Sequence, residues 1–144
     1  MIEVVSDASV ALKWFHEEGE QEVESSRALV ELFGKRRIAL SVLDLTPYEV
    51  GNALLRGSAK ATSEQTATVL GALGLICPQV KPSPDELASA AALAETNDLT
   101  LYDAMYAAVA RSRGAHLATM DAALLRAGLG SRPSEIVATV RSGR

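Results

Sequence analysis

The sequence predicts an α/β fold in which a short parallel sheet of four or five strands is covered by helices. Short apolar runs alternate along the chain with longer segments of helical apolar spacing. Strands that alternate with helices form mainly parallel sheets with both faces covered. The chain has 144 residues and no internal repeat or linker, so we expect one domain spanning residues 1–144.

Four segments are expected to be strands. Three have short apolar runs, at residues 2–6 (IEVVS), 37–42 (RIALSV) and 115–120 (AHLATM). The fourth, residues 76–82 (ICPQVKP), contains Pro78, which lacks a backbone N–H and is therefore expected only at a sheet edge. The last apolar segment, residues 134–140 (SEIVATV), fits either a strand or a turn of helix.

The remaining elements are predicted to be helices. Apolar spacing places them at residues 10–15, 21–33, 46–60, 62–74, 83–98, 100–114 and 121–128. Thr46, followed by Pro47, is expected to cap the third of these helices. Gly34 is expected to end the second.

The composition is that of an ordinary globular protein, with 48% hydrophobic and 22% charged residues. No segment approaches the roughly 20 apolar residues of a membrane span, and the first residues lack the features of a signal peptide. A single cysteine, Cys77, excludes a disulfide framework and a thiolate metal cluster. We therefore expect a cytoplasmic protein with no membrane association.

The charge is unevenly distributed. A net charge of −4 argues against a protein that simply coats nucleic acid. Residues 111–144 nevertheless contain six arginines against two acids, Asp121 and Glu135. The arginines of this segment are compatible with binding of a polyanion, although the rest of the chain is acidic.

Four acidic residues occur where strands end or helices begin: Asp7, Glu49, Asp103 and Asp121. Each has a structural explanation, as a helix N-cap or as the third residue of a capping box. However, the carboxyl ends of parallel strands share one edge of the sheet, where ligands bind. Carboxylates gathered there repel one another, and Mg²⁺ or Mn²⁺ relieves that repulsion because both prefer oxygen ligands. Two such ions support phosphodiester hydrolysis.

Other chemistries have little support in the sequence. No glycine-rich phosphate loop is present, and Ser9 lacks the G-x-S-x-G elbow of a serine hydrolase. The two histidines, His16 and His116, are a hundred residues apart with no HExxH motif. A phosphoaspartyl protein with Asp7 as nucleophile usually has a lysine from a late strand, and no lysine follows Lys81.

Four stretches resemble the acidic motifs of PIN-domain nucleases, and in particular the VapC-type toxin ribonucleases of bacterial toxin–antitoxin pairs. These are VVSDASVALKWF, LTPYEVGNAL, LTLYDAMYAAVA and LATMDAALL, which follow the order of the family and span residues 4–125. The resemblance implies a three-layer PIN-like sandwich and a metal-dependent endoribonuclease that cleaves RNA phosphodiester bonds. It also implies a four-carboxylate Mg²⁺ or Mn²⁺ site, with Asp7 and Asp103 as direct ligands and Glu49 and Asp121 binding partly through water.

Three polar residues match positions that support this site in the family. Ser9 and Thr119 are expected to flank the acids and hydrogen-bond to them, and Asn52 lies one turn after Glu49. The alternative function is a non-catalytic PIN-like partner-binding protein in which the acids only cap helices.

The resemblance further implies a cognate small antitoxin, an RNA substrate and a two-fold homodimer. Trp14 and Phe15 end the first predicted helix and cannot both lie in one buried stripe, so we expect a hydrophobic groove there for the antitoxin. Tyr102 and Tyr106 are four residues apart and are expected to share a helix face used for packing or dimerisation.

Overall fold

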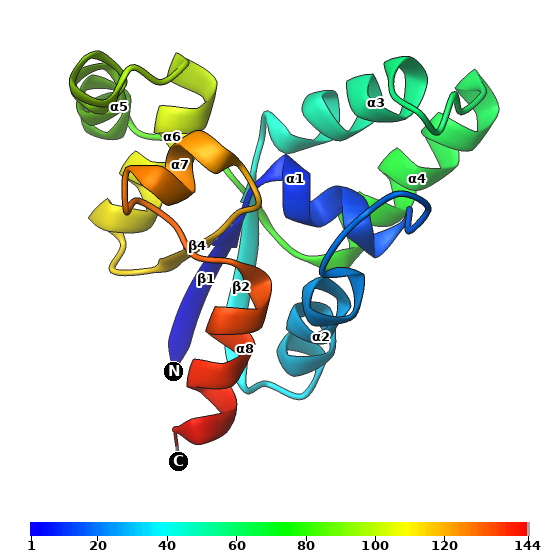
Figure 1. The fold of residues 1–144 in the computed structure, drawn as a ribbon, viewed down its shortest axis with the longest axis horizontal. Coiled ribbons are helices and arrows are strands. Elements are labelled where there is room, and N and C mark those ends of the chain that lie inside the picture. The colour runs from blue at the N-terminus through cyan, green and yellow to red at the C-terminus, as the bar shows by residue number, and fades with distance from the viewer. Residues whose placement is uncertain (144) are drawn as a thin grey trace.

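The computed structural model describes residues 1–143 and contains a four-stranded parallel sheet in the order β3-β2-β1-β4. Figure 1 labels β1, β2 and β4 of this sheet. The strands are β1 (Ile2–Ser6), β2 (Ile38–Leu43), β3 (Gln79–Val80) and β4 (His116–Ala118). In the register, Val4 lies opposite Leu40 of β2 on one side and His116 of β4 on the other. β1 is therefore a central strand, paired with β2 on one side and with β4 on the other.

Helices cover both faces of the sheet. They are α1 (Ala8–Ala11), which continues as a 3₁₀ turn (Leu12–Trp14), α2 (Val23–Gly34), α3 (Thr46–Arg56), α4 (Ser63–Ile76), α5 (Pro84–Asn97), α6 (Leu101–Ser112), α7 (Ala122–Arg126) and α8 (Pro133–Ser142). Figure 1 shows α5, α6 and α7 on one side of the sheet and α2, α3 and α4 on the other. Within residues 1–143 no helix combines the length and the apolar character needed to cross a bilayer.

The protein has a hydrophobic core on each face of the sheet, because successive side chains of β1 point to opposite faces. Val4 packs with residues of α1, α2, α3 and α8, whereas Val5 faces the other way and packs with residues of α6 and α7. Both side chains are buried, as expected for a parallel strand covered on both faces. α5 forms an outer layer on α6 through close contacts of Ala90 with Ala104 and Ala108. The predicted α/β sandwich is confirmed.

Two uncertain segments are now assigned. β3 lies at the edge of the sheet, immediately after Pro78, where the missing N–H is tolerated. Residues 134–140 belong to helix α8, because Ile136, Val137 and Val140 follow helical spacing and are buried against the first core.

The predicted role of Thr46 as a helix cap is wrong. The N-cap position of α3 is Leu45, and Thr46 is the first helical residue and fully buried. The Thr46 hydroxyl instead accepts a hydrogen bond from Leu43 N at 3.0 Å and bonds the Tyr106 hydroxyl at 2.7 Å. The buried hydroxyl therefore links β2 to α6, and Glu49 does not form a capping box with it.

The structure does not support an aromatic groove at Trp14 and Phe15. Trp14 is only 9% exposed, belongs to the first core and donates its Nε1–H to the Ser26 carbonyl at 2.9 Å. Phe15 is half-buried and packs against the same core. The 3₁₀ turn after α1 rotates the indole inward over α2, so this ring has a packing role.

Candidate active site

The four predicted acids line one pocket of about 240 Å³ at the carboxyl edge of the sheet: Asp7, Glu49, Asp103 and Asp121. They come from the end of β1, the first turns of α3 and α6, and the N-cap of α7. Helices that pack antiparallel to the strands place their N-termini at this edge, where the helix dipole favours negative charge. The parallel topology thus brings together residues that are up to 114 positions apart.

Asp7 is the most constrained of the acids. It is 4% exposed, and its backbone N–H donates to the Ala118 carbonyl at 3.1 Å, which holds it between β1 and β4. Its Oδ1 accepts from Val10 N at 3.2 Å, the cap of α1, and from Ser9 Oγ at 2.6 Å. Its Oδ2 accepts from Thr119 Oγ1. The helix-capping function predicted for Asp7 is real, and it coexists with a place in the pocket.

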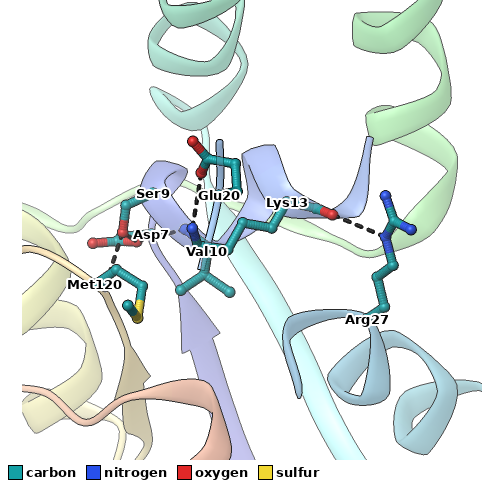
Figure 2. A network of polar contacts seen from close by, with 7 residues as sticks. All are labelled: Asp7, Ser9, Val10, Lys13, Glu20, Arg27 and Met120. Carbon is teal, nitrogen blue, oxygen red and sulfur yellow. Dashed lines mark hydrogen bonds and ion pairs between the residues drawn. The ribbon is translucent and has the colours of Figure 1, made fainter. Parts of the chain in front are cut away.

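Both hydroxyls that contact Asp7 also accept a hydrogen bond from the backbone. Met120 N donates to Ser9 Oγ at 3.0 Å, and Asp121 N donates to Thr119 Oγ1 at 2.9 Å. Because an ionised carboxylate only accepts, each hydroxyl donates its own proton to Asp7 while it accepts from the backbone. Figure 2 shows the Ser9 side chain between the Asp7 carboxylate and Met120. Ser9 and Thr119 therefore tie the segment after β4 to Asp7.

Gly130 lies close against the Thr119 side chain. A Cβ at position 130 would lie 2.6 Å from Thr119 Cγ2 and 3.2 Å from the Leu117 carbonyl oxygen. Ser131 forms an isolated parallel bridge with Ala118, which brings this loop alongside the end of β4. The close approach leaves space only for glycine and limits the movement of the Thr119 side chain.

Burial and mutual repulsion oppose the negative charge of the pocket. Burial raises the pKa of Asp7 to about 6, even though hydrogen bonds from Ser9, Thr119 and Val10 lower it, and the charge of Asp103 raises it further. Burial also raises the pKa of Asp103, with a further contribution from Asp121. Burial likewise raises the pKa of Glu49, although a hydrogen bond from Tyr106 lowers it.

No cationic side chain neutralises these acids within residues 1–143. The ion pairs found there join Lys13 to Glu20, Arg27 to Glu17, Lys35 to Glu31 and Arg113 to Glu86. Lys13 is six residues after Asp7, but its buried ammonium bonds Glu20 at 2.8 Å (Figure 2). The carboxylates of the pocket depend instead on neutral hydrogen-bond donors.

Tyr106 is a residue of the pocket that the sequence analysis missed. Its hydroxyl donates to Glu49 Oε1 at 2.7 Å, and burial raises its pKa far above the usual range, so that it remains a donor. Tyr106 is 1% exposed whereas Tyr102 is 61% exposed, so the two rings do not form the common packing or dimer surface predicted for them. The sequence could have identified Tyr106 by its position three residues after Asp103, which places both residues on one side of α6.

The other predicted residues are placed as follows. Asp121 caps α7 by accepting from Leu124 N at 3.0 Å. Asp103 donates its backbone N–H to the Thr100 hydroxyl at 3.1 Å, and its carboxylate lines the pocket. Asn52 is exposed and lines a neighbouring hollow with Glu49, outside the pocket that the four acids share.

The pocket has the oxygen ligands that a hard cation prefers, but these ligands are not already arranged around one point. Within residues 1–143, no three candidate ligand groups lie close enough together to hold a metal ion as they stand. Carboxylates that repel one another move apart when no cation joins them, and both oxygens of Asp7 are engaged by hydroxyls. The donors are nevertheless all oxygens with unpaired negative charge, which is the type of site that Mg²⁺ and Mn²⁺ prefer.

The raised pKa of Asp7 predicts a pH-dependent cost in stability. Between its ordinary value of 3.8 and about 6, the folded state holds a proton that the unfolded state has lost. Stability therefore falls as the pH rises through this range, by an amount on the order of 3 kcal/mol above pH 7. We therefore compare the free energies of unfolding of Asp7→Asn and the wild type by urea denaturation in EDTA. We expect the difference between them, variant minus wild type, to increase by this amount from pH 4 to pH 7. A difference that is constant with pH would contradict the pKa shift.

The profile of the PIN domain family matches residues 4–129. No curated protein sequence matches the chain significantly. Solved structures do: PAE2754 from Pyrobaculum aerophilum superposes with a TM-score of 0.71 at 23% identity, covering 99% of this chain and 97% of that one. VapC20 of Mycobacterium tuberculosis, described as a sarcin–ricin loop cleaving toxin, has a TM-score of 0.66 at 15% identity, with 87% and 95% covered.

A toxin–antitoxin complex from Klebsiella pneumoniae has the same fold, with a TM-score of 0.62 at 19% identity and coverage of 90% and 97%. At these identities the structural similarity establishes the fold. The family profile extends over most of the chain, from β1 to the end of α7, and includes all four acids of the pocket. The chain therefore belongs to the PIN domain family.

Proposed function

We propose that this protein is a metal-dependent endoribonuclease of the VapC type, the toxin component of a bacterial toxin–antitoxin pair acting in the cytoplasm. The observation that carries the proposal is the shared pocket of Asp7, Glu49, Asp103 and Asp121 in a PIN domain. The similarity in fold to VapC20, described as a sarcin–ricin loop cleaving toxin, supports it.

Asp7 and Asp103 are proposed to bind Mg²⁺ or Mn²⁺ directly, with Glu49 and Asp121 completing the site partly through water. Mg²⁺ keeps several of its waters, which suits carboxylates that line one pocket without closing into a cluster. When bound, such ions activate a water for attack on the phosphate and stabilise the leaving oxygen. Ser9 and Thr119 hold the Asp7 carboxylate in one orientation for this purpose.

The rival function is a non-catalytic partner-binding protein whose acids only cap helices. Caps account for Asp7 and Asp121, which accept bonds from backbone N–H groups of α1 and α7. They do not account for Glu49, whose carboxylate is bonded to Tyr106 within the pocket. They also do not account for the burial of Asp7, because a cap works equally well on the surface. These observations favour the nuclease.

The direct test is cleavage of RNA by purified Asp7→Asn. The amide keeps the shape of the side chain but loses its charge, so we expect a folded protein whose cleavage falls to the background. Asp44→Asn is the matched control, since Asp44 is an exposed acid at the end of β2 that lies outside the pocket. Wild-type cleavage by Asp7→Asn would exclude this site.

Metal binding is expected to raise the melting temperature. A ligand that binds only the folded state at 100 times its Kd stabilises by about 2.7 kcal/mol, or roughly 5 to 10 °C for a domain of this size. We expect millimolar Mn²⁺ to produce such a shift and EDTA to reverse it. Asp103→Asn is expected to melt higher than the wild type without metal, because repulsion is relieved, and to show a smaller shift with Mn²⁺. An unchanged melting temperature with Mn²⁺ would count against the metal site.

We also propose a small antitoxin partner and a two-fold homodimer. The fold shared with the Klebsiella toxin–antitoxin complex supports the first. Small side chains allow two helices to approach closely, and for the dimer this support comes from α5, where Ser89, Ala91 and Ala92 are exposed. The alanines of α6 are buried within the chain. With Trp14 in the core, the antitoxin is proposed to reach the acids with a cationic side chain in place of metal.

These partners can be tested together by co-expression with the adjacent upstream reading frame, followed by size determination by light scattering. We expect a complex with two copies of this chain, whose affinity falls in Asp103→Asn because one negative charge facing the cation is lost. Asp44→Asn again serves as the control. Equal affinity of both variants for the upstream product would show that the partner does not enter the pocket.

A further inference from the structure

The Tyr106 side chain connects the second core of the protein to the pocket. Its ring is 1% exposed and packs with Leu43 of β2 and Leu117 of β4 among other core residues. Its hydroxyl emerges at the pocket and contacts Glu49 on α3 at 2.7 Å. The tip of a fully packed side chain therefore holds a half-buried carboxylate that belongs to a different helix.

The direction of this hydrogen bond follows from the Glu49 carboxylate, and Thr46 is the second partner of the Tyr106 oxygen. The Thr46 hydroxyl oxygen accepts from Leu43 N at 3.0 Å, so its proton is available to the Tyr106 oxygen at 2.7 Å. Tyr106 has one hydroxyl proton, and an ionised carboxylate only accepts. The proton of Tyr106 therefore lies toward Glu49. The series runs from a backbone N–H of β2 through two hydroxyls to Glu49 Oε1.

We infer that Tyr106 is the positioning residue of Glu49, and that Thr46 orients the hydroxyl through which it acts. The inference rests on the proposed function, in which Glu49 helps to hold the metal. Glu49 has one more rotatable bond than the three aspartates, so it needs a partner to hold one rotamer. The bond to Tyr106 commits Oε1 and leaves Oε2 for a ligand in the pocket.

Helix α6 consequently controls two of the four acids. It carries Asp103 and, three residues later on the same side, the hydroxyl that holds Glu49. A phenylalanine would fill the same space in the core, so packing alone does not require a hydroxyl at position 106. The oxygen of this buried group bonds Thr46, which connects it to β2, and Glu49 at the pocket.

The test is Mn²⁺ binding to Tyr106→Phe, measured by calorimetry on the full chain. Loss of a group that orients a metal ligand typically weakens metal affinity by about 10- to 100-fold, and we expect a loss in this range. Tyr102→Phe on the same helix removes an exposed hydroxyl and is expected to bind Mn²⁺ as the wild type does. Thr46→Val, which keeps the shape of the side chain but removes the hydroxyl that bonds Tyr106, is expected to weaken binding in the same direction.

A double-mutant cycle separates positioning from general stability. In a Glu49→Ala background, Tyr106→Phe is expected to cause no further loss of Mn²⁺ affinity, because the carboxylate that it positions is gone. Wild-type affinity in Tyr106→Phe, or losses that multiply in the double variant, would overturn the inference. If Mn²⁺ binding follows the expected pattern but wild-type protein cleaves no RNA, the proposed nuclease fails and the positioning role stands. If the wild type binds no Mn²⁺, both fail.

Discussion

The Asp7 carboxylate is buried at the end of a central strand, where no cation from residues 1–143 pairs with it, and the surrounding structure compensates for that burial. Its two oxygens accept bonds from Ser9, Val10 and Thr119. To supply them, α1 must begin immediately after β1, and the segment after β4 must lie against it. Gly130 allows that segment to approach closely. The position of one charged group thus determines the path of two loops.

Neutral hydroxyls replace cations throughout the pocket. Ser9, Thr119 and Tyr106 each donate to a carboxylate, and each donor is directed by a further hydrogen bond that begins at a backbone N–H. A lysine or arginine here would satisfy the acids and compete with a metal ion. Hydroxyls fix the orientation of the carboxylates without removing their charge. The raised pKa values of three acids show what this arrangement costs the metal-free protein.

Helix capping and a place in the pocket are compatible functions for the same side chain. Asp7 and Asp121 each cap a helix, and both line the pocket. The reason is geometric: in a parallel α/β sheet the helix N-termini and the ligand-binding crevice lie at the same edge. A carboxylate has two oxygens and several lone pairs, so one bond to the backbone leaves others for a ligand. A structural explanation for an acid at this edge is therefore weak evidence against function.

Local pattern alone determined the α/β class, most element positions, the edge position of residues 76–82 and the presence of four acids at one sheet edge. These follow from periodicity and from the shared direction of parallel strands, which need no knowledge of individual contacts. Tertiary structure decided the partners of single polar atoms. Thr46 bonds Tyr106, sixty residues away, instead of capping its helix, Trp14 turns into the core and Asn52 lies outside the pocket. Spacing shows which residues share a face of one element, but the atom that each side chain meets belongs to another element, which only packing places.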